Sequence, residues 1–161
     1  TTALRLFEAA FGMDPKRETA GYMKDRFHAS LSAVLAAAER GTDEAIPNEA
    51  RRKELREKAL AWLNDELSLI ERELSSNGKF GFNLLNAFRV SPRKALQRLQ
   101  SEPDLTDVRG DGLNAVPADE RAKWRDLWER VDDLLASTHP NTQPESSQQS
   151  PSADPSDDTS N

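Results

Sequence analysis

The chain has 161 residues, of which 36% are hydrophobic and 31% charged, a composition that suits one domain of thin helical layers with solvated faces. The lack of cysteine excludes disulfides, thiolate catalysis and cysteine-ligated zinc, and it fits a reducing, cytoplasmic compartment. Most of the net charge of −6 comes from four acidic residues after Ser137, so residues 1–136 carry only −2, which disfavours nucleic-acid binding. Apolar runs such as 31–38 are too short for a membrane span.

The first two predicted helices cover residues 2–13 and 16–39, where apolar side chains recur at spacings of three and four. Asp14-Pro15 separates them, and Gly41 is expected to stop the second helix before a loop. Their inward side chains are expected to be Leu4, Phe7, Phe11, Met23, Phe27, Leu31, Val34, Leu35 and Ala38, with Leu6 and Ala10 widening the stripe of the first helix.

The third predicted helix, over residues 48–75, is the longest. Asn48 is a good N-cap residue and follows Pro47. Beyond this helix, residues 79–90 fit either a short helix or a loop. The inward stripe of the long helix is expected to contain Leu55, Ala59, Trp62, Leu63, Leu67, Ile70 and Leu74.

Two further helices are predicted after residue 90. Ser91-Pro92 has the form of an N-cap and first helical residue, and the helix that it opens is expected to reach residue 101 with Leu96 and Leu99 inward. Residues 104–116 are predicted to be an irregular connector. The last helix, over 117–136, is expected to pack mainly on the Trp62 helix through Trp124, Leu127, Trp128, Val131, Leu134 and Leu135.

The chain is thus expected to form an α-helical domain over 1–138, followed by a disordered acidic tail over 139–161. Pro, Ser, Gln, Asn, Thr and Asp dominate this tail, which contains no aromatic or branched aliphatic residue. Such a segment cannot bury enough apolar surface to offset the entropy lost on ordering.

Ala3, Phe7, Ala10 and Pro15 follow one another at spacings of four, three and five, the pattern of the second helix of a tetratricopeptide (TPR) repeat. In that pattern two small residues let a neighbouring helix approach, the aromatic ring fills the gap, and the proline opens the next helix. A second repeat is assigned to Phe27, Ala59 and Leu63. Because the pattern begins in mid-repeat, we expect the chain to be the C-terminal end of a longer solenoid, incomplete at its N-terminus.

Five segments extend this similarity along the chain: 4–11, 26–31, 52–63, 102–109 and 116–121. Together they resemble the C-terminal region of large bacterial multidomain proteins in which a serine/threonine protein kinase domain, or sometimes a WD40 propeller, is joined to TPR repeats. The resemblance implies an all-α fold of antiparallel helical hairpins at the end of an α-solenoid, closed by a C-terminal capping helix.

The same resemblance implies a non-catalytic protein–protein interaction and capping module that needs no cofactor. Its expected partner is protein: upstream TPR repeats or a kinase domain of the same chain, or an unknown protein. The alternative is the regulatory or substrate-positioning region of a bacterial serine/threonine kinase whose catalytic domain lies upstream of Thr1. Two departures count against a standard repeat array. Phe27 and Ala59 lie 32 positions apart rather than 16, and residues 79–90 fit the pattern poorly. This chain contains no kinase motif.

No residue of the chain is expected to be catalytic or to bind a metal. His28 lies beside the inward Phe27 without a second ligand at a useful spacing, so a structural or surface histidine is the preferred interpretation. Paired acids such as Asp65-Glu66 are interpreted as solvated surface. The three tryptophans lie on apolar stripes and are interpreted as core residues.

Basic residues gather at two places. In the segment 51–58 they alternate with acids, and the pairs Glu49–Lys53 and Glu54–Lys58 are expected to support the helix. The segment 78–101 contains no acid, so it forms either a solvated basic face or a contact for an anionic partner, from which the acidic tail could screen it. Its basic residues are Lys79, Arg89, Arg93, Lys94 and Arg98.

Overall fold

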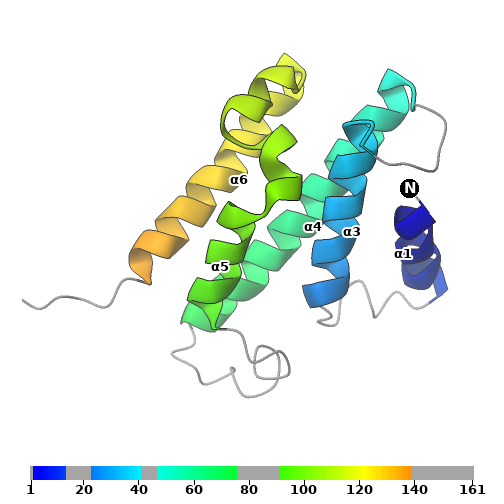
Figure 1. Cartoon of the computed structure of the whole chain (residues 1–161). Coiled ribbons are helices and arrows are strands. Elements are labelled where there is room, and N and C mark those ends of the chain that lie inside the picture. Colours follow the sequence, from blue (N-terminus) through cyan, green and yellow to red (C-terminus); the bar gives the residue numbers. More distant parts are fainter. Residues whose placement is uncertain (1, 14–22, 41–46, 76–90, 139–161) are drawn as a thin grey trace, which may run out of the picture.

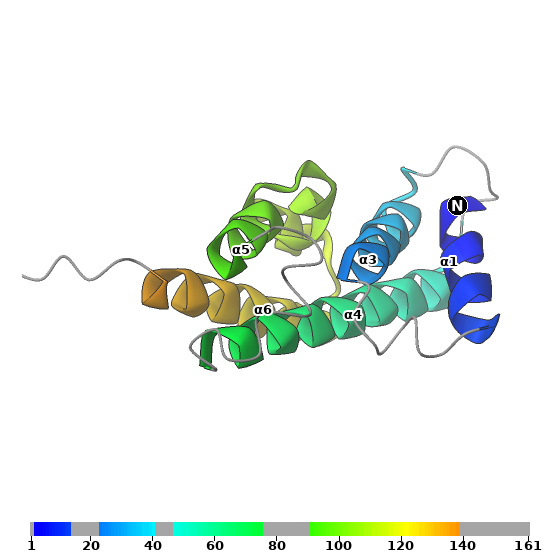
Figure 2. The ribbon, with the colours of Figure 1, turned by 90° about the horizontal axis from the view of Figure 1, so that it is seen from below.

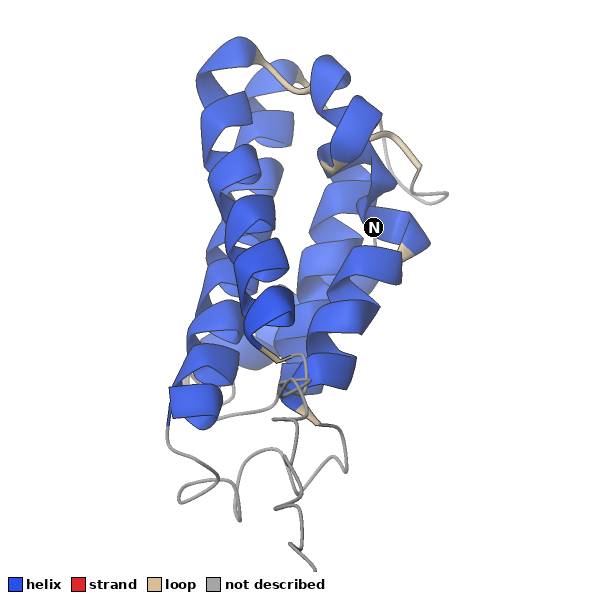
Figure 3. Ribbon diagram, turned by 90° about the vertical axis from the view of Figure 1, so that its left-hand side faces the viewer, coloured by secondary structure: helices blue, strands red, loops and turns tan. Residues whose placement is uncertain are grey.

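The computed structural model describes residues 2–13, 23–40, 47–75 and 91–138, and the regular structure within these ranges is entirely helical (Figures 1 and 3). The expected all-α fold class is therefore confirmed for the described residues. Predictions for Pro15 and for residues 16–22, 79–90 and 139–161 lie outside them. The helices are α1 (Thr2–Met13), α3 (Met23–Ala37), α4 (Glu49–Ser75), α5 (Pro92–Ser101) and α6 (Ala118–Ser137), with 3₁₀-helices η2 (Pro103–Val108) and η3 (Gly110–Ala115).

The helices from α3 to α6 alternate in direction, so that each is antiparallel to the one before it and α4 runs parallel to α6 (Figure 1). In Figure 2, α4 and α6 lie side by side, with α3 and α5 on one side of that pair. Helix α1 crosses the first half of α4, where Lys58 contacts Glu8. The core is thus a layered set of antiparallel helices with α1 at one end.

Local sequence signals explain most helix ends. Asn48 caps α4, because its Oδ1 accepts a hydrogen bond from the Arg51 backbone N–H at 2.9 Å. Ser91 caps α5, because its Oγ accepts from the Lys94 backbone N–H at 3.4 Å, and Pro92 follows as the first helical residue. Both predicted caps are confirmed.

Helix α3 ends earlier than predicted, at Ala37 rather than residue 39, and the predicted stop at Gly41 lies outside the described residues. Glu39 adopts the left-handed conformation, with φ of 59°. Its N–H donates to the Ala36 carbonyl at 3.3 Å, and the Arg40 N–H donates to the Leu35 carbonyl at 2.9 Å. This pair of bonds is the Schellman motif, which usually has glycine where Glu39 stands.

The predicted apolar stripes form one continuous core. The rings of Trp62 and Phe11 meet in a T-shaped contact, with centroids 5.7 Å apart, and this contact joins α4 to α1. Trp128 is buried and donates its Nε1–H to the Val108 carbonyl at 2.7 Å. The interpretation of all three tryptophans as core residues is confirmed. Burial of the stripes is nearly complete at Leu4, Val34, Leu55, Ala59, Leu63, Leu67, Ile70, Leu96, Leu99, Trp124, Leu127 and Val131.

The prediction of an irregular connector between α5 and α6 is wrong. The structure has two 3₁₀-helices there, η2 and η3. Leu105 and Val108 anchor η2 in the core. Gly112 allows η3 to press against η2, because a Cβ at this position would lie 1.9 Å from the Thr106 carbonyl oxygen. Arg109 donates a hydrogen bond to the Leu99 carbonyl at 2.9 Å. This carbonyl lies in the last turn of α5, where carbonyl groups have no hydrogen-bond partner within the helix.

Helix α6 shares its contacts between α5 and α4 and also touches η3. The expectation that α6 would pack mainly on α4 is therefore wrong. Two amphipathic helices flank α6 because α5 returns antiparallel beside it, a relation that the spacing of apolar residues does not reveal.

Candidate functional site

A buried ion pair joins α3 to α4 in the core. Nη2 of Arg26 lies 3.9 Å from Oε2 of Glu66, and both side chains are almost wholly buried. The interpretation of Glu66 as solvated surface is therefore wrong. Its position three residues after Leu63 and four before Ile70 is the signal that would have placed it on the inward face.

Burial raises the pKa of Glu66 to about 7, against the opposing attraction of Arg26 and Arg98. A carboxyl group with such a pKa suits proton transfer in an accessible cleft. Here it is sealed between two packed helices, so no substrate can approach it. Glu66 is consequently a structural acid of the core.

A second polar cluster ties the start of α4 to the start of α6. Arg56 donates to both carboxylate oxygens of Glu120, at 2.8 and 2.9 Å, and to Glu49 at 2.7 Å. Hydrogen bonding to Glu120, and next to Glu49, raises the pKa of Arg56, so the guanidinium stays charged. The exposed Lys53 pairs with Asp119 at 2.8 Å, which raises the pKa of the lysine and lowers that of the aspartate.

Of the two ion pairs predicted along α4, Glu54–Lys58 is confirmed and Glu49–Lys53 is wrong. Glu54 and Lys58 do pair along α4, at 3.1 Å, whereas Glu49 pairs with Arg56 instead of Lys53. Lys58 also reaches Glu8 of α1, at 2.6 Å. The basic residues of α4 therefore hold neighbouring helices as well as their own.

A cavity of about 330 Å³ opens beside this cluster, between α3, the start of α4 and η2. Its walls combine apolar residues with ionised side chains that already have partners: Arg52 pairs with Glu39, and Asp107 pairs with Arg40, outside the lining, at 3.0 Å. Among the described residues, its lining includes no serine, cysteine or histidine, and its acids Glu39, Glu49 and Asp107 are held in ion pairs with arginines. The cavity has the size of a small ligand site without an evident reaction to perform.

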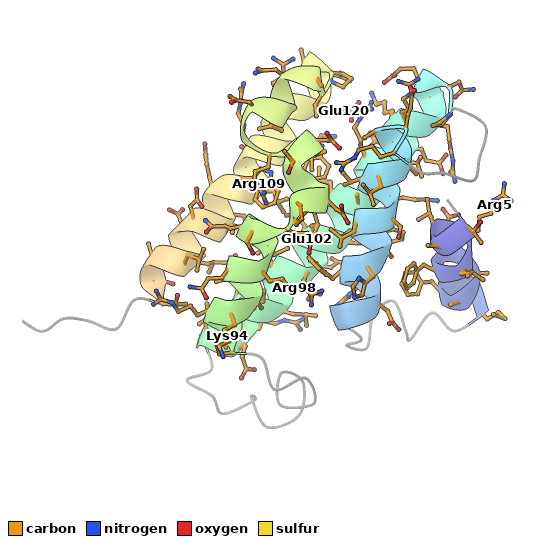
Figure 4. All side chains as sticks on the ribbon, in the orientation of Figure 1. Arg5, Lys94, Arg98, Glu102, Arg109 and Glu120 are labelled. Atoms are coloured by element: carbon orange, nitrogen blue, oxygen red, sulfur yellow. The ribbon has the colours of Figure 1, made fainter. Side chains whose placement is uncertain are left out.

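The described members of the basic stretch lie on α5, where Figure 4 labels Lys94 and Arg98. Arg93 donates to the Thr138 carbonyl at 3.2 Å, at the end of α6. The guanidinium of Arg98 lies over the ring of Phe27, 4.5 Å from its centroid, a cation–π contact. Lys94 is exposed. The fold thus uses two of these three cations internally, while Lys79 and Arg89 lie outside the described residues.

His28 is half-buried, and its ring meets the ring of Phe27 edge-on at 5.8 Å between centroids. Within the described parts of the chain, no three side chains of His, Cys, Asp or Glu gather closely enough to hold a metal ion. None of the helices described here is both long and apolar enough to cross a membrane.

The residues assigned to the TPR pattern occupy different environments. Phe27, Ala59 and Leu63 are buried in the core. On α1, by contrast, Ala3 is exposed and Phe7 and Ala10 are half-buried, whereas Leu4 and Phe11 make the deepest contacts. The face of α1 that was expected to receive a neighbouring helix is therefore largely open.

That open face carries a regular apolar stripe. Leu6 and Met13 are 67% and 82% exposed, and they are the large apolar side chains left exposed within the described residues. The expectation that Leu6 would widen the inward stripe of this helix is therefore wrong, because α3 and α4 cover only the side of α1 that carries Leu4 and Phe11. With Ala3 and Ala10 they recur at spacings of three, four and three, which places all four on one side of the helix. We call Ala3, Leu6, Ala10 and Met13 the α1 stripe.

Comparison with protein-family models, curated proteins and solved structures finds no match to this chain. The geometry of the described residues is therefore the basis for assigning a function, and its most open feature is the α1 stripe.

Proposed function

We propose that this chain is a non-catalytic helical module that binds protein, and that its partner packs a helix against the α1 stripe. The observation that carries this proposal is the exposure of Leu6 and Met13 on a helix whose other side is already buried. A helix that is apolar on two sides is normally covered on both. Exposed apolar patches on folded domains commonly mark sites of protein interaction.

The stripe has the geometry that a partner helix requires. Spacings of three and four are those by which side chains of one helix fill the gaps of another. The two alanines, Ala3 and Ala10, allow the backbones to approach closely, while Leu6 and Met13 supply the apolar area. A helix of 12 residues presents this seam over about three turns.

Helix α1 is also anchored well enough to act as a fixed docking edge. Phe11 packs on Trp62, and Glu8 contacts both Lys58 at 2.6 Å and Arg51 at 3.7 Å. Binding would therefore not have to order this helix first, which lowers the entropic cost of association. The same edge suits a capping role, in which the module covers the last open face of a helical array.

A selection of helical peptides displayed against the whole chain tests the proposal. Selected peptides should bind the wild-type chain and lose at least about tenfold in affinity to Leu6→Glu, a loss of about 1.4 kcal/mol. Ala61→Glu, on the exposed side of α4, is the matched control and should bind as the wild type does. Binding should also shift the Met13 methyl signal in NMR spectra, which Met13→Leu assigns. Peptides that bind Leu6→Glu and wild type equally would refute the α1 stripe as the binding surface.

A further inference from the structure

The α1 stripe is complementary to itself. We propose that its partner is the α1 stripe of a second copy of this chain, packed antiparallel about a two-fold axis at the level of Glu8. This inference rests on the proposed function and names the partner of the same surface. In such an isologous contact each residue of one copy meets the symmetry-related position of the other.

The register follows from the order of large and small residues. With the axis at residue 8, Met13 of one copy lies opposite Ala3 of the other, and Leu6 lies opposite Ala10. The half-buried Phe7 then lies opposite the exposed Ala9. Every large side chain therefore meets a small one, which is the arrangement that lets two helices interlock at short distance.

A parallel pairing of the same two helices lacks this complementarity. It would set Leu6 against Leu6 and Ala3 against Ala3, so layers of two large side chains would alternate with layers of two small ones, and no single distance between the helices would fill both. Antiparallel pairing also opposes the two helix dipoles favourably. The antiparallel register is thus favoured by both shape and electrostatics.

Charge does not oppose the contact. The α1 stripe itself contains no ionisable residue. Glu8 lies at the level of the axis, and its carboxylate is compensated by Lys58 at 2.6 Å and Arg51 at 3.7 Å. The two symmetry-related glutamates would therefore meet as parts of ion pairs rather than as free like charges.

The dimer should be weak and reversible. One helix of three turns covers less area than the standard interface of roughly 1,600 Å². We expect a dissociation constant on the order of 100 µM, corresponding to a protein that is monomeric when dilute and dimeric when concentrated.

Sedimentation equilibrium of the full chain tests the contact. The wild-type chain should dimerise with a dissociation constant on the order of 100 µM. Leu6→Glu and Met13→Glu should each raise this dissociation constant at least about tenfold. Both positions are exposed, so the variants should keep the wild-type circular dichroism, and Ala61→Glu should dimerise as the wild type does. Unchanged dimerisation of both glutamate variants would overturn the proposal.

Engineered cysteines test the register, because the native chain contains none. A mixture of Ala3→Cys and Met13→Cys chains should form a disulfide-linked heterodimer at least about tenfold faster than Ala3→Cys alone. Equally fast linkage of Ala3→Cys with itself would show a parallel contact and overturn the proposed register. A wild-type chain that stays monomeric up to about 1 mM would overturn the self-association, whereas peptide binding lost in Leu6→Glu would still support the proposed function.

Discussion

Replacing Glu66 by glutamine should make the chain more stable at neutral and higher pH. Glutamine keeps the shape of the side chain but cannot ionise. The ordinary pKa of 4.5 applies to the unfolded chain, while burial raises the folded-state pKa to about 7. The folded chain therefore binds this proton more tightly than the unfolded chain does.

The sign and size of the effect follow from this difference in proton affinity. The contribution of Glu66 to the free energy of unfolding is fully present below pH 4.5 and is lost as pH rises through about 7. The gap between these values, at about 1.4 kcal/mol per pH unit, amounts to about 3 kcal/mol. Glu66→Gln should thus match the wild type near pH 4.5 and exceed it by up to about 3 kcal/mol at pH 8.

Urea unfolding followed by circular dichroism at steps from pH 4.5 to pH 8 measures this difference. Comparing variant with wild type at each pH cancels the titration of the other groups. Glu57→Gln, which removes an exposed carboxyl from the same helix, is the matched control for the loss of one negative charge. If the wild type gained stability over Glu66→Gln as pH rose, the attraction of Arg26 would outweigh burial and the reasoning would be refuted.

Three further changes test the packing by urea denaturation. Trp128→Ala should cost about 3–5 kcal/mol because it empties a buried site, and a loss under about 1 kcal/mol would contradict that burial. Gly112→Ala should lower the free energy of unfolding by about 1–3 kcal/mol, because the new Cβ would strike the Thr106 carbonyl oxygen. Gly12→Ala, where a Cβ on α1 meets open space, should raise it by up to about 1 kcal/mol. Similar effects at both positions would contradict this contrast. Glu39→Gly should gain about 1 kcal/mol by relieving the positive φ, and a loss would show that the ion pair with α4 matters more.

The sequence by itself determined the helices and their inward faces. Apolar spacing placed α1, α4, α5 and α6 within a residue or so of their observed ends, because helix periodicity and capping are set by neighbours in the chain. It also marked Trp62, Trp124 and Trp128 as core residues. These features depend on local interactions, so a single sequence reveals them.

The tertiary structure alone decided which partners meet across the core. Lys53 had an acid four residues before it on α4, yet it pairs with Asp119, 66 positions away. Glu66 had the composition of a surface residue and is buried only because α3 covers it. The openness of the α1 stripe depends in the same way on where α3 and α4 lie. Such contacts between residues far apart in the sequence depend on how the helices pack, and the spacing of apolar residues within one helix does not predict them.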